Sequence, residues 1–239
     1  MSALYKPNCA KCKEVIITNT TKLFLYHGTS EKNFEPYFGG GRGYHDYGNG
    51  FYTTENIEAA KEWACQGQHG SSFVYAYELD LESLNLLNLD ENNTLAWVSV
   101  LMTHRRSKKI RGAALERCNK MIERYGIDVS KYDLVRGFRA NDSYFQFTTD
   151  FVTDTITLET LMKSIVAGDL GKQVCLKSEK AYMQLGKQVD VVTISGEDYE
   201  RYHNRYLTND TDARMLANNY SNEPQEGWLL SDILKGGAL

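Results

Sequence analysis

The chain is organised around two stretches, LFLYHGT at residues 23–29 and DYGNGFYTT at residues 46–54. The first is an apolar run that ends in a polar His-Gly-Thr, which is typical of a buried strand whose end emerges from the core. The second is a glycine-rich turn followed by a short aromatic and β-branched strand. These patterns predict two strands that present polar and aromatic side chains at their ends.

A helix is predicted directly after the second strand, from Glu55 to Cys65. Thr54 is placed to cap it, and Glu55 and Glu58 would complement the positive end of the helix dipole. The side chains predicted to form its buried stripe are Ile57, Ala60, Trp63 and Ala64.

His27, Tyr52 and Trp63 are the candidate site residues of this region. Two aromatic rings such as Tyr52 and Trp63 can flank a flat ligand, since offset stacking adds about 0.5–1.5 kcal/mol per ring pair beyond burial. Gly28 leaves its backbone N–H and C=O unshielded, so a carboxamide could dock there. Taken singly, the three side chains would be a hydrogen-bonded structural histidine and two core aromatics. Their coincidence favours a binding site.

The sequences YHGT at 26–29 and GNGFY at 48–52, followed by Trp63, resemble the NAD-binding core of ADP-ribosyltransferases. The similarity is to the diphtheria-toxin and poly-ADP-ribose-polymerase branch, which has a His-Tyr-Glu triad. The sequence is more similar still to a bacterial ADP-ribosyltransferase-like family that carries a Gly-x-Gly-Phe-Tyr-Thr-Thr block. The resemblance covers 23–65, with fainter support as far as Leu185. It implies an α+β fold with a split β-sheet core, in which two antiparallel-rich sheets form a cleft with helices alongside.

The resemblance implies that His27, Tyr52 and Gln173 form the catalytic centre. In the His-Tyr-Glu enzymes a Glu begins a late strand, and the matching strand here begins KQV at 172–174. A Gln can hydrogen-bond a ribose hydroxyl. It cannot supply the negative charge that stabilises a positively charged transition state.

Asp142 is a carboxylate that could substitute for that missing charge. Its competing interpretation is the N-cap of a helix beginning near Ser143. Glu179 is also near in sequence, but it is predicted to open a helix and ranks below Gln173. Asp142 therefore joins the candidate catalytic residues.

The resemblance further implies that NAD binds with its nicotinamide between Tyr52 and Trp63 and that His27 holds the adenine-side ribose. The glycine run at 39–43 could wrap a pyrophosphate through its N–H groups, with Arg42 supplying charge; the alternative is a surface loop. No metal is expected. The residues assigned to NAD binding are Tyr26, Gly28, Thr29, Arg42, Gly50, Phe51 and Trp63.

The implied activity is mono-ADP-ribosylation, in which ADP-ribose passes from NAD to a macromolecular acceptor and nicotinamide is released. By analogy with proteins of this type, the resemblance suggests a toxin or host-modifying factor, and such a protein could have an inhibitory partner. The acidic balance favours a protein over a nucleic acid as acceptor. Two alternatives stay open: an NAD glycohydrolase with water as acceptor, and a catalytically inactive NAD or ADP-ribose-binding module, which Gln173 would allow.

Length and composition set wider limits. The 239 residues carry a net charge of −4, which argues against a nucleic-acid binder that relies on bulk charge. No apolar run approaches the roughly 20 residues of a membrane span, and the start lacks the layout of a secretion signal, so a cytoplasmic protein is expected. Three parts are predicted: an arm at 1–21, an NAD-binding domain at 22–195, and a C-terminal helix and tail at 196–239 packing on it.

The remaining segments alternate between strand and helix patterns. A short helix is predicted from Glu31 to Tyr37, and another from Glu197 to Tyr206 with a loosely attached end. The basic sextet 104–109 is interpreted as a solvated connection between two helices. Cys9 and Cys12 form a lone Cys-x-x-Cys without a second pair, so a turn in the arm is favoured over half of a zinc site. The other predicted strands cover 72–80, 84–89, 132–138, 172–177 and 186–194, and the other helices cover 93–103, 109–125, 158–167 and 178–185.

Overall fold

The first two predicted strands lie side by side in the middle of a mixed sheet, as a computed structural model of the chain shows. It describes residues 22–40, 44–68, 70–105, 107–140, 142–167, 171–222 and 226–236. The predicted arm at 1–21 with Cys9 and Cys12, and the predicted phosphate ligand Arg42, lie outside these residues.

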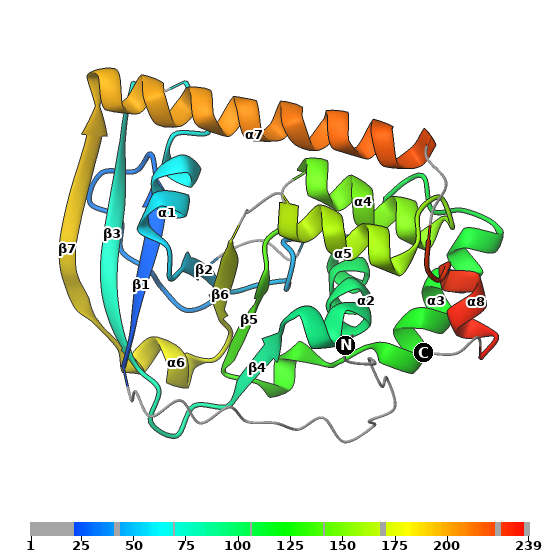
Figure 1. The fold of residues 1–239 in the computed structure, drawn as a ribbon. Helices are drawn as coiled ribbons and strands as arrows, with labels where there is room; N and C mark the ends of the chain where they lie inside the picture. The colour runs from blue at the N-terminus through cyan, green and yellow to red at the C-terminus, as the bar shows by residue number, and fades with distance from the viewer. Residues whose placement is uncertain are drawn as a thin grey trace, which may run out of the picture.

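The strands form one seven-stranded sheet in the order β4-β5-β6-β2-β1-β3-β7 (Figure 1). Among the described strands, β4 and β5 pair in parallel and the other neighbours are antiparallel. The α+β class predicted from the sequence is confirmed, whereas the expectation of two separate sheets is wrong. The strands are β1 (Lys22–Thr29), β2 (Phe51–Thr54), β3 (Ser71–Asp80), β4 (Leu86–Leu89), β5 (Leu134–Phe138), β6 (Lys172–Leu176) and β7 (Leu185–Ser195).

The sheet is nevertheless opened between β1 and β2. β1 pairs with β3 along its whole length, from Lys22 to Thr29, but it pairs with β2 only at Tyr26 and Thr54. On its other side, β2 pairs fully with β6. Because β1 and β2 diverge beyond one point of contact, side chains at the open end of the junction can line a cavity rather than fill a core.

Helices cover the two halves of the sheet differently (Figure 1). The segments α2 to α5, with α8, pack beside the β4–β5–β6 half, whereas α1 and the long α7 lie against β1, β3 and β7. The helices are α1 (Ile57–Ala64), α2 (Thr94–His104), α3 (Ala113–Tyr125), α4 (Asp142–Val152), α5 (Leu158–Ala167), α6 (Glu179–Gln184), α7 (Gly196–Asn222) and α8 (Leu230–Leu234), with short 3₁₀ turns at Glu91–Asn93 and Val129–Lys131.

Alternate side chains of each central strand pack into two different hydrophobic cores, one on each face of the sheet. In β5, Val135 belongs to the cluster with α2–α5, and its neighbour Leu134 packs with Leu25 and Tyr77 on the other face. Alternation with a period of two residues requires this separation. Both faces of the sheet centre are therefore buried, and the strand ends around the β1–β2 opening are held rigidly.

Helix α1 begins two residues later than the sequence predicts. Asn56, not Thr54, is its N-cap, since the Asn56 side chain accepts from the backbone N–H groups of Glu58 and Ala59. The Thr54 hydroxyl instead donates to the carbonyl of Lys172 on β6. Thr54 is still the last residue of β2, so the strand-to-strand hydrogen bond takes precedence over the cap.

The short helix predicted from Glu31 to Tyr37 is absent, because this segment forms turns. Asn33 has a positive φ of 62°, which breaks a right-handed helix. Pro36 also disfavours the helical conformation of the residue before it. The segment folds back so that the Phe34 ring stacks on His27 at 4.5 Å between centroids.

The C-terminal part is more ordered than the sequence predicts. The helix expected to end at Tyr206 continues to Asn222 as α7, which contacts α1, α4, α5 and β7. The end expected to be loosely attached forms α8, whose Leu230 and Ile233 are buried in the core. Trp228 stays partly exposed, and its backbone N–H donates to the Glu159 carboxylate at 2.8 Å.

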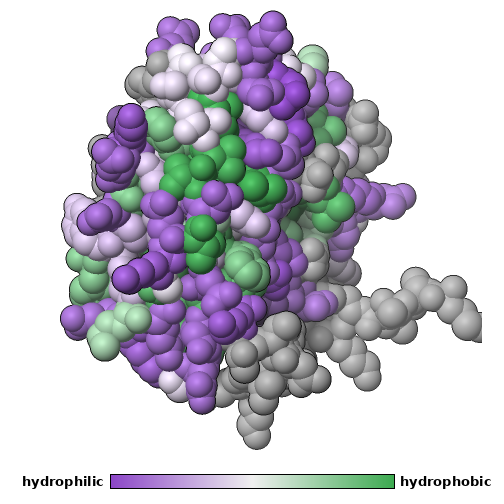
Figure 2. Space-filling model, turned by 90° about the vertical axis from the view of Figure 1, so that its left-hand side faces the viewer, coloured by the Kyte–Doolittle hydropathy of each residue, from purple (hydrophilic) through white to green (hydrophobic). Residues whose placement is uncertain are grey.

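The outer edge of the sheet is formed by β7. Its side chains are mostly exposed, including Val189 and Val191. Figure 2 shows apolar side chains on this side of the molecule. The edge lies two strands away from the β1–β2 opening. The candidate site below is therefore separate from this surface.

Candidate functional site

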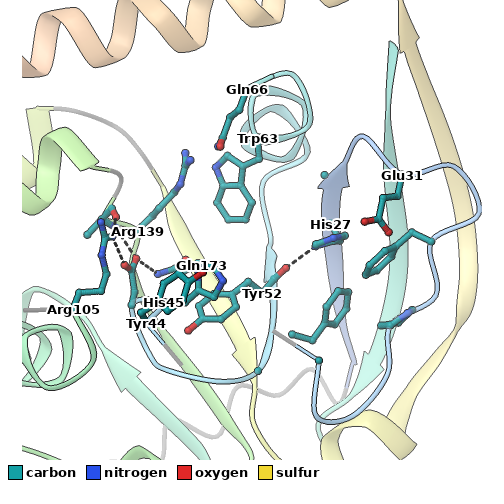
Figure 3. A pocket seen from close by; sticks show the side chains of 18 of the residues that line it. His27, Glu31, Tyr44, His45, Tyr52, Trp63, Gln66, Arg105, Arg139 and Gln173 are labelled. Atoms are coloured by element: carbon teal, nitrogen blue, oxygen red, sulfur yellow. Dashed lines mark hydrogen bonds and ion pairs between the residues drawn. The ribbon is translucent and has the colours of Figure 1, made fainter. Parts of the chain in front are cut away.

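A cavity of about 700 Å³ occupies the opening between β1 and β2. Figure 3 shows Trp63 above Tyr52, with His27 on one side and Arg105 and Arg139 on the other. These side chains come from elements far apart in the chain, including β1, β2, α1 and the ends of α2 and β5. Gln173 of β6 completes the group. Four of the residues singled out in the sequence thus line one cavity.

His27 bridges the two diverging strands. Its Nδ1 lies 2.8 Å from the backbone oxygen of Tyr52, and Phe34 covers its ring. Burial lowers the pKa of His27, although the hydrogen bond to Tyr52 partly opposes this. Because a carbonyl oxygen can only accept, Nδ1 carries the proton in the neutral ring and Nε2 is an acceptor. His27 can therefore accept a hydrogen bond from a ligand hydroxyl.

Acidification is expected to destabilise the protein through His27. Burial lowers the pKa of His27 below its usual value of 6.5, so the unfolded chain binds a proton more readily than the folded one. The stability contributed by the neutral ring is complete above about pH 7 and is lost as the pH falls through about 6.5. Chemical unfolding at several pH values checks this, with His27→Gln as the non-titrating comparison. An equal loss of stability in both proteins between about pH 7 and pH 5 would contradict it.

Tyr52 contributes its ring rather than an acid. Its hydroxyl donates to the carbonyl of Gly48 at 2.6 Å and accepts from the N–H of Tyr47 at 2.9 Å. Burial raises the pKa of Tyr52 well above its usual value. The ring lies parallel to that of Tyr47, 6.3 Å away, and is tilted against His45 at 5.3 Å. Tyr52 thereby ties the 44–50 loop to the strand end and presents a fixed aromatic surface.

The guanidinium of Arg139 lies over the Trp63 ring, 4.6 Å from its centroid. Among the described residues, that guanidinium makes no hydrogen bond or ion pair. Burial lowers the pKa of Arg139 to about 10, so the group stays charged at neutral pH. The buried Nε1 of Trp63 also has no hydrogen-bond acceptor among the residues that the structure describes. This end of the cavity therefore carries a cation that is not neutralised by a contact of its own.

A chain of polar contacts joins Gln173 to α4. Gln173 donates through Nε2 to Asp46 at 2.7 Å, and Asp46 forms an ion pair with Arg105, also at 2.7 Å. The same guanidinium pairs with Asp142 at 2.7 Å. Asp46 is buried, whereas the Asp142 side chain is 92% exposed. The buried carboxylate of the cavity is thus Asp46 and not Asp142.

Two glycines of the site are required by close packing. A Cβ on Gly28 would lie 2.0 Å from the backbone oxygen of Ala60, and one on Gly50 would lie 2.4 Å from the Cys175 sulfur. Real Cβ atoms do not approach other atoms so closely, so larger residues do not fit without movement. Gly28 therefore lets α1, which carries Trp63, pack directly on β1.

The structure brings most of the predicted site residues together. The cavity is lined by His27, Gly28, Gly50, Phe51, Tyr52, Trp63, Asp142 and Gln173. Tyr26 packs instead with the cluster under α1 and α7, and Thr29 accepts from the N–H of Glu31 through its hydroxyl. Neither lines the cavity, and Arg42 is outside the described residues.

Four charged residues of the cavity, Glu31, Asp46, Arg105 and Arg139, were not among the predicted site residues. Asp46 begins the glycine turn 46–50, and Arg139 directly follows β5, so their positions next to predicted strand ends were the available signal. The interpretation of 104–109 as a solvated connection is wrong for Arg105. Its side chain is 18% exposed and is held by two carboxylates.

Comparison with known proteins gives one match. A family model described as a protein of unknown function (DUF3990) matches residues 23–186, which include both strands of the opening and Gln173. No curated protein and no solved structure matches the chain. Within the described residues, no helix has the length and apolar character needed to cross a membrane, and no group of three or more His, Cys, Asp or Glu could hold a metal ion.

Proposed function

The chain belongs to the DUF3990 family, and we propose that it is an NAD-dependent mono-ADP-ribosyltransferase. The observation that carries the proposal is the convergence of His27, Tyr52, Trp63 and Gln173 on one cavity at the strand opening. The resemblance to an NAD-binding core that singles out these residues is a property of the sequence and does not depend on their positions in space. An unrelated set of core residues would not be expected to share a cavity.

The residues present fit a dinucleotide in size and in charge. A cavity of about 700 Å³ is within the range of small-molecule sites. NAD carries two phosphates, and Arg139 offers a partly buried guanidinium with no ion pair among the described residues. Asp46, Glu62 and Asp142 act on it through space, but buried charges are normally paired by direct contact, and an anionic ligand would supply that contact.

In the proposed reaction the nicotinamide–ribose bond breaks and nicotinamide leaves with the bonding electrons. The acceptor nucleophile forms a bond to the same ribose carbon and releases its proton. Tyr52 and Trp63 contribute aromatic surfaces to the nicotinamide, and His27 accepts a hydrogen bond from a ribose hydroxyl through Nε2. Gln173 orients a second ribose hydroxyl. Tyr52 is not assigned a proton transfer, because its raised pKa keeps the phenol neutral.

The proposal is tested by calorimetry with NAD, followed by a nicotinamide-release assay and mass spectrometry of cell extract incubated with labelled NAD. Binding, release and a labelled macromolecule are expected, with the acceptor identified by mass spectrometry. Release of free ADP-ribose without any labelled macromolecule would instead indicate a glycohydrolase. Binding without release would indicate an NAD-binding module, and absence of binding would overturn the proposal.

Arg139→Gln is expected to weaken NAD binding by about 10- to 100-fold, since a hydrogen bond to a charged group contributes about 1.5–3 kcal/mol. Nicotinamide riboside, which has no phosphate, should lose less affinity than NAD in the variant, since only the contact of Arg139 with the Trp63 ring changes for it. Calorimetry with both ligands measures the difference. Arg111→Gln is the matched control, because Arg111 is exposed and donates only to the carbonyl of Lys108. Equal weakening of both ligands by Arg139→Gln would contradict a phosphate contact.

A further inference from the structure

The amide of Gln173 is held in one orientation. Its Nε2 donates to Asp46 at 2.7 Å and lies 3.3 Å from the carbonyl of Phe138. Both neighbours are acceptors, so the amide nitrogen must point toward them. Both of these hydrogen bonds are made by Nε2, the Tyr47 hydroxyl is a further polar neighbour of the amide, and Gln173 lines the cavity. Gln173 therefore presents an acceptor to a ligand and keeps its donor inside the protein.

Asp46 is itself fixed by two further donors, one on each carboxylate oxygen. The N–H of Ala140 donates to its Oδ2 at 2.9 Å, and Arg105 donates to its Oδ1 at 2.7 Å. The Asp46 side chain is only 8% exposed. A carboxylate held by three donors has little freedom to turn, and its charge lies one hydrogen bond from the cavity.

We propose that Asp46 is the positioning residue for Gln173 and supplies, through the hydrogen bond to its amide, the negative charge that Gln173 lacks. The inference rests on the proposed ADP-ribosyl transfer. The Asp46–Gln173 pair replaces a single catalytic carboxylate: the charge is on Asp46, and the Oε1 that it polarises contacts the ribose hydroxyl. The polarised amide oxygen would stabilise positive charge developing on the ribose in the transition state.

The pair makes a specific prediction for Gln173→Glu. A glutamate there would place two carboxylates within hydrogen-bond distance of each other in a buried site, and both burial and the like charge raise the pKa of the new side chain. When protonated, the introduced carboxyl can donate to Asp46 and present its carbonyl oxygen to the cavity, as the amide does. When ionised, it loses this arrangement.

The test measures nicotinamide release by wild type and Gln173→Glu across about pH 5.5 to 8.5, bracketing the raised pKa expected for a buried carboxyl. The ratio of variant to wild-type turnover is expected to be near one at the acidic end and to fall about tenfold per pH unit above that pKa. In the double variant Asp46→Asn/Gln173→Glu, the turnover ratio should no longer fall as the pH rises, because the new carboxylate no longer faces a like charge. A ratio that rises with pH would overturn the proposal, since Gln173→Glu would then simply restore a catalytic carboxylate.

Asp46→Asn alone separates positioning from packing. We expect a turnover about 100-fold lower, with KM for NAD within about threefold of wild type, because a preorganised charge acts mainly in the transition state. Circular dichroism and thermal melting identify a misfolded variant. A folded Asp46→Asn with wild-type turnover would overturn the proposal.

A stability measurement keeps the test independent of turnover and of folding losses in Asp46→Asn. Because the introduced carboxyl has a raised pKa in the folded state, Gln173→Glu becomes progressively less stable than wild type as the pH rises above about 4.3, the usual glutamate value. Burial alone also raises the pKa of this carboxyl, so the same gap is measured between Asp46→Asn/Gln173→Glu and Asp46→Asn, where the like charge is absent. A pH dependence of the gap that is equal with and without the Asp46 carboxylate would show that Asp46 and residue 173 are not coupled and would overturn the inference. If the pH dependence is weaker without that carboxylate but the wild type binds no NAD, the proposed function has failed and the positioning role fails with it, while the coupling itself stands.

Discussion

His27→Ala and Tyr52→Ala are each expected to abolish NAD-dependent labelling, with nicotinamide release lowered by about 100-fold or more. His27→Ala removes the acceptor Nε2 and also the hydrogen bond that joins β1 to β2. Tyr52→Ala removes the aromatic surface below Trp63 and releases the 44–50 loop from the strand end. The fold should survive both changes, because other side chains make most of the contacts in the surrounding cores. Single-turnover nicotinamide release, with circular dichroism as the folding check, measures the effect.

Conservative variants separate the two functions of each side chain. His27→Asn can still donate to the carbonyl of Tyr52 but offers no acceptor at the position of Nε2, so it should be stable and inactive. Tyr52→Phe keeps the ring and should retain turnover within about tenfold, since the phenol is not the proton donor. Wild-type labelling by either alanine variant would remove His27 or Tyr52 from the assignment. An inactive but correctly folded Tyr52→Phe would show that the hydroxyl has a catalytic role.

Local pattern was sufficient to predict the elements that frame the cavity. The apolar run before His27, the Phe51-Tyr52 pair after a glycine turn, and the stripe containing Trp63 each have a period that allows one main interpretation. The elements formed where these patterns placed them, as β1, β2 and α1. The strand that carries Gln173 was located in the same way, whereas its role was implied by the resemblance to the His-Tyr-Glu enzymes. Positions that are set by the periodicity of a single helix or strand could thus be predicted from the sequence.

The charged part of the site depends on contacts between distant segments, which no local pattern records. Asp46 meets Gln173 and Arg105 across 127 and 59 positions of the chain. Arg139 is recognisable only when Trp63 is seen beside it. A basic sextet is normally solvated, so Arg105 could not be distinguished from its neighbours by composition. The most informative feature of the cavity, the buried carboxylate beside the glutamine, required the tertiary structure.

The same limit explains the two helix errors. The pattern at 31–37 suggested a helix, but the preference of Phe34 for stacking on His27 is a tertiary contact. The helix predicted to end at Tyr206 extends to Asn222 because α7 packs along α1, α4 and α5. Tertiary packing commonly overrides propensity in this way. Its functional consequence is that α7 holds α1, and with it Trp63, over the cavity.

Gly28→Ala is expected to lower the free energy of unfolding by about 3 kcal/mol, at the upper end of the usual cost of overpacking. The added Cβ would lie 2.0 Å from the carbonyl oxygen of Ala60 and 2.9 Å from the backbone nitrogen of Ala64. Both atoms belong to the backbone of α1, so no rotamer change can relieve the contact and the helix itself must move. For a chain of this size the melting temperature should fall by roughly 6–12 °C, measured by calorimetry.

Gly40→Ala is the matched control, because Gly40 also lines the cavity but the nearest atoms to its Cβ would be those of Tyr37, at 3.2–3.3 Å. A loss within about 1 kcal/mol is expected there, since the Tyr37 ring is exposed and can shift, and a small movement relieves the contact with the Tyr37 backbone oxygen. The comparison also separates two roles of Gly28. If its value lay only in an unshielded backbone for a carboxamide, Gly28→Ala would weaken NAD binding without changing the melting temperature. A melting temperature equal to that of wild type would therefore contradict the packing role, whereas a large drop would establish that this glycine is required because α1, carrying Trp63, packs directly against β1.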